Sequence, residues 1–268
     1  MPMYAMPDGT NIYYEDFGTG TPVVFVSSGN ATHAMWDAQV AELALEFRTV
    51  TFDWRGTGRS DRPRTGYTAA HVVSDVVTLI SEVIGAPAVV VGHGMGGHIA
   101  ILAAQQHPEW VAGLGVASSG PWYCGERDGV AGGMSLEFIN GSSSGAGGAY
   151  PDLLAAMTDT YLFHAPVSAD VRTATIQQQL EWPLYVLDRY DEDMLELDHR
   201  AALPQITQPA LILHGRHDAK QRFSGAAVLL EGLPNAELVV FEDSAHSPHA
   251  EEAGAFSAAL AALVRRAS

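Results

Sequence analysis

A short glycine-rich stretch, residues 92–96 with the sequence Gly-His-Gly-Met-Gly, has the spacing of a turn that presents a catalytic side chain. In the motif G-x-S-x-G, a serine lies on a strained turn between a strand and a helix, and the glycines let the neighbouring backbone pack closely. The position of that serine is occupied here by Gly94. The sequence therefore contains the framework that presents a nucleophile without the nucleophile itself.

The segments around this turn predict an α/β fold. Patterns of buried strands occur at residues 23–26, 49–52, 88–91, 111–117 and 209–214. Stretches with helical spacing, such as residues 33–46 and 69–84, lie between several of them. Regular alternation of this kind is typical of a mostly parallel sheet that is covered by helices on both faces.

One long interval, residues 120–205, interrupts the alternation. It contains helix-like segments near 151–161, 169–180 and 182–187, and a glycine and serine tract at 141–148 that we expect to be a mobile connection. Because the interval is too long for a plain loop, it predicts a helical cap. We therefore expect a single domain, with a core of residues 1–119 and 206–268 and the cap inserted between them.

Composition limits the kinds of partner. The chain of 268 residues has 14 Lys and Arg against 31 Asp and Glu, a formal charge of −17 that disfavours nucleic acid and anionic membrane surfaces. No long apolar run and no signal-peptide pattern are present, so a cytoplasmic location is expected. A single cysteine, Cys124, excludes an internal disulfide bond. The oligomeric state is left undetermined.

Five motifs, taken in order, resemble the α/β-hydrolase superfamily, in particular the small esterases, lactonases, carbon–carbon bond hydrolases and cofactor-free haloperoxidases. They are residues 8–14, 52–63, 92–96, 211–218 and 243–249. The resemblance covers almost the whole chain apart from the cap. It implies hydrolysis of a carboxylic ester or lactone, with no cofactor and no metal ion.

The same resemblance implies an acid and a base for this reaction. In such proteins the acid follows a late strand and the histidine precedes the last helix, which points to Asp218 and His246. A histidine is a good general base near neutral pH, and a carboxylate on its other ring nitrogen fixes the tautomer and stabilises the cation that forms.

The resemblance also places an oxyanion hole at the backbone N–H groups of Asn30 and Met95. The family often has His-Gly-X after its first buried strand, whereas this chain has Ser28, Gly29 and Asn30. The loop therefore lacks the usual histidine and gains the polar side chain of Asn30. Gly29 belongs to a loop at the carboxyl end of a buried strand, where open α/β sheets bind ligands, and is a candidate substrate-binding residue.

The cap is rich in aromatic and aliphatic residues, which favours a small-molecule substrate that is uncharged or apolar in its main part. Trp122 and Trp182 are candidates for the wall of the substrate pocket, although cap aromatics are most often core residues. His93 and His98 flank the glycine turn and are interpreted as packing or surface histidines. Asp53 and Arg55 are more simply residues that brace a glycine turn than substrate ligands.

A zinc site is a rival interpretation of the histidines. His214 with His217, and His246 with His249, form two H-x-x-H pairs that could bind zinc together with Asp218. His214 lies at a strand end and His217 in the following turn, so the spacing does not make the two converge. The hydrolase motif already accounts for the same residues, and it is preferred.

Three explanations of Gly94 remain open. The chain is an engineered serine hydrolase whose nucleophile was removed to trap substrate, or glycine is native and the Asp218–His246 dyad works without it. In the second case the dyad activates water, or removes a substrate proton as in a lyase, cyclase or cofactor-free oxygenase. The third explanation is a non-catalytic small-molecule binding protein. The retained acid, histidine and glycine turn disfavour the third most.

Overall fold

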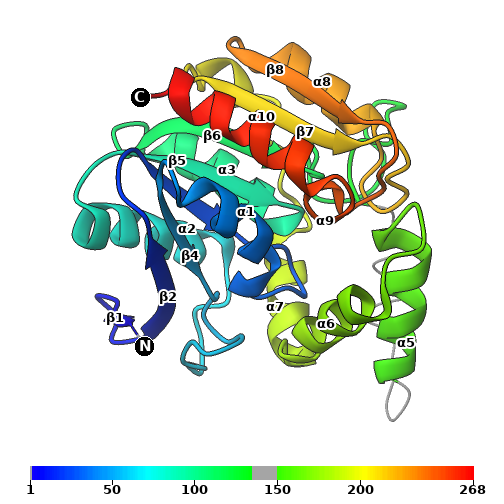
Figure 1. Ribbon diagram of the computed structural model, residues 1–268, viewed down its shortest axis with the longest axis horizontal. Coiled ribbons are helices and arrows are strands. Elements are labelled where there is room, and N and C mark those ends of the chain that lie inside the picture. Colours follow the sequence, from blue (N-terminus) through cyan, green and yellow to red (C-terminus); the bar gives the residue numbers. More distant parts are fainter. Residues whose placement is uncertain (1, 135–149) are drawn as a thin grey trace.

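The computed structural model describes residues 2–134 and 150–268. Its centre is an eight-stranded sheet with the strand order β1-β2-β4-β3-β5-β6-β7-β8 (Figure 1). The strands are β1 (Met3–Ala5), β2 (Asn11–Phe17), β3 (Pro22–Val26), β4 (Arg48–Phe52), β5 (Ala88–His93), β6 (Val111–Ala117), β7 (Ala210–Gly215) and β8 (Ala236–Phe241). Strand β2 pairs antiparallel with both β1 and β4, and the strands from β4 through β3 and β5 to β8 pair in parallel with their neighbours. The predicted mostly parallel α/β sheet is confirmed.

Helices cover both faces because the central strands are apolar on both sides. The helices of the core are α1 (Asp37–Leu43), α2 (Ala69–Thr78), α3 (Met95–Gln106), α8 (Ser224–Gly232), α9 (Pro248–Glu251) and α10 (Ala253–Arg266). In β3, Val23 and Phe25 belong to the cluster that α10 completes, whereas Val24 and Val26 belong to the cluster that α2 and α3 complete. Figure 1 looks onto the face that α1 and α10 cover.

Short 3-10 or π-helical segments adjoin three helices: η1 (His33–Trp36) precedes α1, η2 (Leu79–Ile84) follows α2, and η4 (Thr158–Leu162) follows the helix at Tyr150–Met157. A fourth segment, η5 (Leu203–Gln205), stands alone before β7. The helix expected over 69–84 is α2 continued by η2, and it ends at Gly85 with a positive φ of 77°. The helix expected over 33–46 is shorter than predicted, because α1 ends at Leu43 and the chain turns back towards β4.

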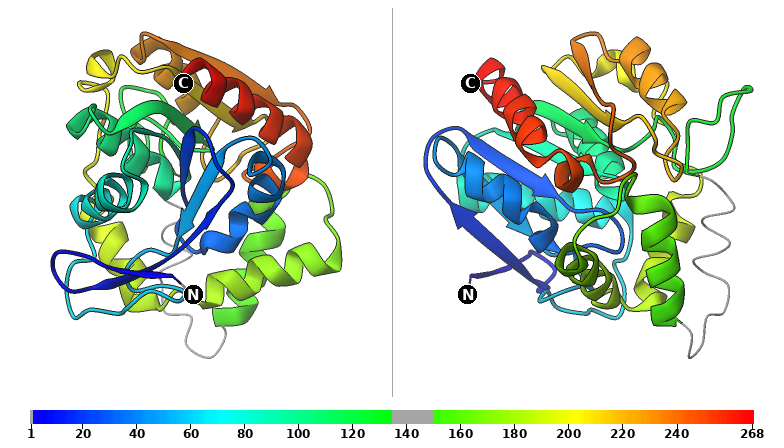
Figure 2. Two further views of the ribbon diagram at one scale, coloured as in Figure 1. Left: turned by 60° about the vertical axis from the view of Figure 1, so that its left-hand side comes forward. Right: turned by 45° about the vertical axis from the view of Figure 1, so that its right-hand side comes forward.

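The interval of residues 120–205 lies between β6 and β7 and supplies α5 (Tyr150–Met157), α6 (Ala169–Leu180) and α7 (Leu184–Met194). Figures 1 and 2 show these green helices grouped on one side of the molecule, outside the layers that cover the sheet. The helix expected at 182–187 instead begins after Pro183 and runs on to Met194. The glycine and serine tract at 141–148 lies outside the described residues.

Glycines let three backbone segments meet at the turn between β5 and α3. A Cβ atom on Gly92 would overlap the carbonyl oxygen of Gly96, and one on Gly96 would overlap that of Val26. Gly94 has a φ of 54°, in the region that favours glycine. Because these residues are glycines, the turn packs closely against strand β5 and the end of β3. Larger residues would not allow so close an approach.

None of the helices within residues 2–134 and 150–268 has the length and apolar character needed to cross a membrane.

We expect Gly92→Ala to lower the free energy of unfolding by about 1–3 kcal/mol, the usual cost of overpacking. The added methyl group would overlap a backbone oxygen that cannot move by itself. Gly254→Ala is the matched control, because no heavy atom lies within 4 Å of its added Cβ. Urea unfolding followed by circular dichroism measures both, and an equal stability of the two variants would contradict this account of the turn.

Candidate active site

The candidate site lies where parallel strands end side by side. The loop after β3 carries Ser28, Gly29 and Asn30, and the turn after β5 carries Gly94. Asp218 follows β7 and His246 follows β8. Carboxyl ends of parallel strands meet at one edge of a sheet, so this topology brings together residues that are far apart in the sequence.

His246 and Asp218 form a buried pair. His246 Nδ1 lies 2.8 Å from Asp218 Oδ2, and the two residues are 2% and 5% exposed. The backbone N–H groups of Lys220 and Gln221 donate to the other carboxylate oxygen at 3.0 and 2.8 Å. When Asp218 is ionised, its carboxylate only accepts hydrogen bonds, which puts the proton of His246 on Nδ1. Nε2 then carries the lone pair of a general base.

His246 Nε2 is buried and has no hydrogen-bond partner within the described residues. Burial lowers the pKa of His246 well below its ordinary value of 6.5, and the nearby Lys220 and His214 lower it further. Burial raises the pKa of Asp218 to about 7, while His214 and the backbone N–H of Gln221 oppose that rise. The imidazole is consequently neutral at neutral pH, which is the state that accepts a proton.

The space next to Gly94 is partly filled by another serine. Ser28 Oγ lies 2.5 Å from the point that the Cβ atom of a side chain at position 94 would occupy. His246 Nε2 lies 3.5 Å from the same point. The hydroxyl group of Ser28 and the ring nitrogen of His246 therefore both face the place of the missing nucleophile.

Asn30 and Met95 lie on two sides of a small cavity of about 20 Å³, which Gly94 and His246 also line. That volume holds about one water molecule or one ligand oxygen. Met95 is the first residue of α3, and the N–H groups of a first helical turn have no partner inside the helix. Asn30 has a φ of 62°, a conformation that asparagine tolerates better than most residues.

Gly29 lies where the loop after β3 packs against the helix α3. A Cβ atom at this position would overlap Met95 Sδ, so glycine is needed for the loop to pack on α3. Gly29 also lines both cavities of the site. The structure therefore places the expected oxyanion donors and Gly29 around one small space beside His246.

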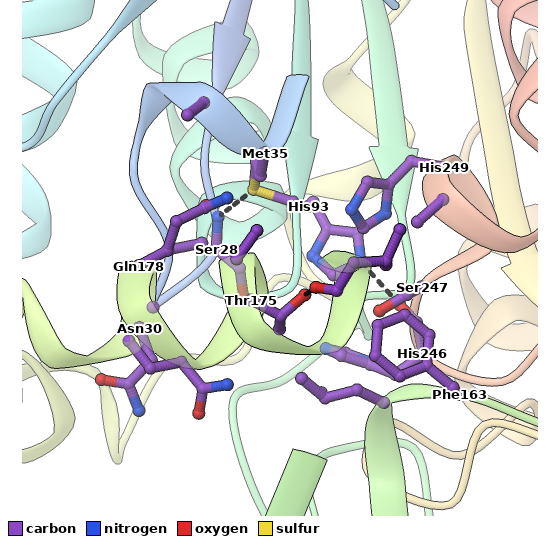
Figure 3. A pocket seen from close by; sticks show the side chains of 18 of the residues that line it. Ser28, Asn30, Met35, His93, Phe163, Thr175, Gln178, His246, Ser247 and His249 are labelled. Carbon is purple, nitrogen blue, oxygen red and sulfur yellow. Dashed lines mark hydrogen bonds between the residues drawn. The ribbon is translucent and has the colours of Figure 1, made fainter. Parts of the chain in front are cut away.

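A larger cavity of about 260 Å³ opens next to the pair. Its wall is mostly apolar, and α5 and α6 supply part of it, including Leu154, Thr175 and Gln178. Ser28 and His246 line it from the ends of the strands. Figure 3 looks into this cavity across the helix that carries Thr175 and Gln178. Its size and lining suit a small, largely apolar ligand.

Trp122 and Trp182 do not line either cavity, so the structure places both away from the expected pocket wall. Both are 1% exposed, and each indole N–H donates to a backbone oxygen: Trp122 to Gly125 at 3.0 Å and Trp182 to Ala31 at 2.8 Å. Trp182 packs the cap against Trp54 of the core, whereas Trp122 packs against Gly132 and Arg200 within the cap interval. Phe163 from the same interval does line the larger cavity.

The histidines beside the turn have structural contacts. His93 Nε2 lies 2.7 Å from the carbonyl oxygen of His246, and the two rings are 4.7 Å apart, so His93 supports the loop that carries the base. His98 Nδ1 lies 2.9 Å from His199 Nε2. Burial lowers the pKa of both His93 and His98 well below the ordinary range.

Asp53 and Arg55 brace the chain around the turn after β4. Asp53 accepts hydrogen bonds from the backbone N–H groups of His33 at 2.8 Å and Arg59 at 2.9 Å. Arg55 forms a buried ion pair with Asp75 at 2.6 Å. Neither Asp53 nor Arg55 lines a cavity of the site.

The two histidines of the pair His214 and His217 contact different residues, so they do not converge on one metal site. His214 Nε2 lies 2.8 Å from the carbonyl oxygen of Gln221, whereas the ring of His217 stacks on that of His164 at 3.7 Å. Across residues 2–134 and 150–268, no group of three or more His, Cys, Asp or Glu side chains is arranged to hold a metal ion.

Two residues at the site were not among the predicted site residues. The sequence marks Ser28 only through the departure from His-Gly-X, and that departure is itself the signal. Lys220 lines both cavities, and burial lowers its pKa to about 8. Its position two residues after Asp218 gave no sign in the sequence that the side chain would turn inward.

Comparison with known proteins identifies the family. The model of the alpha/beta hydrolase family matches residues 23–259, and the chain belongs to this family. It is 31% identical to the AB hydrolase superfamily protein YisY of Bacillus subtilis, over 90% of each chain. It is 30% identical to a non-heme chloroperoxidase of Streptomyces lividans, over 89% of this chain and 90% of that protein.

A solved structure gives a similar result. An esterase from Exiguobacterium antarcticum superposes with a TM-score of 0.91 over 98% of both chains, at 28% identity. The fold class expected from the five motifs is thus confirmed, and two of these proteins, the chloroperoxidase and the esterase, are named for kinds of activity that the resemblance implied.

The protonation of His246 can be measured directly. Because burial lowers its pKa, we expect its imidazole to stay neutral when the pH is brought down to 6.5. Nitrogen-15 NMR of the histidine side chains reports both the charge and the tautomer. The His246→Ala variant assigns the signal, and a midpoint at or above 6.5 would contradict the account.

Proposed function

We propose that this protein hydrolyses a carboxylic ester or lactone, with His246 as general base and Asp218 as the group that orients it. The observation that carries the proposal is the buried, unpartnered Nε2 of His246 at the junction of the two cavities. A base in this position can take a proton from a nucleophile that attacks a carbonyl group bound in the larger cavity. The similarity to an esterase supports the same reaction class.

The two cavities suggest how the substrate would bind. The acyl or alcohol part, uncharged and apolar, would occupy the larger cavity beside Phe163 and Gln178. The carbonyl oxygen would point into the small cavity, towards the backbone N–H groups of Asn30 and Met95. Fixed donors of this kind stabilise the negative charge that develops as the carbonyl is attacked.

Gly94 requires that the nucleophile come from elsewhere. The small cavity has room for about one water molecule beside His246, which would allow the dyad to activate water directly. The same geometry also supports a second candidate function. A neutral imidazole that opens onto an apolar cavity could remove a proton from a substrate carbon, as a lyase, cyclase or cofactor-free oxygenase would.

Product analysis separates the two candidates. Hydrolysis of an aryl ester releases an acid and an alcohol, and one oxygen atom of the acid comes from water. Reaction in ¹⁸O-labelled water therefore puts the label in the acid. Proton abstraction from carbon leaves no such label and exchanges a substrate hydrogen for deuterium in heavy water.

His246→Ala should lower kcat/KM for aryl esters by about 10⁴- to 10⁶-fold, the loss seen when a base that acts together with its partners is removed. Asp218→Asn should lower kcat by about 10⁴-fold, because an amide no longer fixes the tautomer of the imidazole. Steady-state hydrolysis of p-nitrophenyl acetate and butyrate measures both effects.

The exposed His71 provides the matched control. His71→Ala removes an imidazole of the same size from the surface of α2 and should leave kcat/KM within about twofold of the wild-type value. Activity that persists in folded His246→Ala would contradict the assigned base.

A further inference from the structure

Ser28 occupies the space in which a side chain at position 94 would lie. Its Oγ atom is 2.5 Å from the Cβ position of such a side chain, and its Cβ atom is 3.5 Å from that point. The backbone on both sides holds the residue in place. Ser28 N–H donates to Met35 Sδ at 3.3 Å, and the Ser28 carbonyl accepts from the N–H of Ala31 at 3.2 Å.

Ser28 and Gly94 line different cavities, and only the cavity beside Ser28 is large enough to hold a substrate. Ser28 lines the larger cavity, whereas Gly94 lines only the small one. His246 lines both. A hydroxyl group on residue 28 therefore already faces the space that can hold an ester, next to the base.

We infer that Ser28 is the nucleophile of this enzyme and takes over the role of the serine that position 94 lacks. The inference rests on the proposed function. No hydrogen bond joins Ser28 Oγ to His246 Nε2 in the described structure, and such bonds are often long until substrate binds. Both atoms lie within 3.5 Å of the same point, the place that the Cβ atom of a nucleophile at position 94 would occupy.

The reaction then proceeds in two balanced steps. Ser28 Oγ bonds to the carbonyl carbon while its proton passes to His246 Nε2, and the tetrahedral intermediate expels the alcohol, which takes that proton. Water next attacks the acyl group on Ser28 and gives a proton to His246. The second intermediate releases the acid, and Ser28 regains its proton.

The test exchanges the hydroxyl group between the two positions. Ser28→Ala should lower kcat/KM for p-nitrophenyl butyrate by about 10³-fold or more. Its Cβ stays 3.5 Å from a new Cβ at position 94, an ordinary contact, so the double variant Ser28→Ala/Gly94→Ser avoids the 2.5 Å overlap with Ser28 Oγ. That variant should recover at least about tenfold over Ser28→Ala, because the turn presents the new hydroxyl to His246.

Ser27→Ala is the matched control, since Ser27 is the neighbouring buried serine and lines neither cavity. Its activity should match that of the wild type. Thermal unfolding of all variants shows whether they are folded. Folded Ser28→Ala with activity within about tenfold of wild type would overturn the inference and leave water as the nucleophile.

Covalent labelling tests the nucleophile without relying on turnover. A fluorophosphonate should bond through phosphorus to Ser28 Oγ with loss of fluoride, and the proton should pass to His246. Peptide mass spectrometry should find the added mass on residue 28 in the wild type and on residue 94 in the double variant. A label elsewhere, or none, overturns the inference.

The two proposals can fail separately. If neither the wild type nor Ser27→Ala hydrolyses any ester or lactone, the proposed function fails, yet the labelled position still shows whether Ser28 is the nucleophile. If both hydrolyse esters and Ser28→Ala does so equally well, only the inference about Ser28 fails.

Discussion

The hydrogen bond between His246 and Asp218 is the interaction on which the site depends. It joins two buried groups, and a buried carboxylate is unfavourable unless neighbouring donors compensate for lost hydration. The N–H groups of Lys220 and Gln221 provide that compensation, and His93 holds the carbonyl of the loop that carries the base. Together these contacts keep the neutral imidazole directed at the space beside Gly94.

A second constraint is the close approach of backbone segments at the end of β5. Gly92 and Gly96 allow the turn to pack against β3, and Gly29 allows the next loop to pack on Met95. This packing brings the loop after β3 close enough for Ser28 to reach the place of the missing side chain. The space left free at position 94 is thus partly filled by a side chain from the loop after β3.

Much of the fold could be predicted from the sequence, because apolar periodicity and glycine spacing depend on local neighbours. The parallel sheet followed from strand patterns such as residues 23–26, and the α6 helix was predicted at its observed bounds. The direction of individual side chains could not be predicted in the same way. Trp182 is a core residue rather than a pocket residue, and Lys220 turns inward, because both depend on packing between segments distant in the sequence. Ser28 is an intermediate case, since the motif marked it as unusual but only the fold placed it beside Gly94.

A crystal structure of the wild-type protein with an aryl boronic acid bound would test the central claim most directly, because boron forms a tetrahedral adduct that imitates the attacked carbonyl. The account predicts a boron atom bonded to Ser28 Oγ, one boron-bound oxygen in the small cavity within hydrogen-bonding distance of the N–H groups of Asn30 and Met95, and the aryl group in the larger cavity. It also predicts that His246 Nε2 faces the adduct. A boronic acid bound elsewhere, or an imidazole turned away from it, would contradict the account.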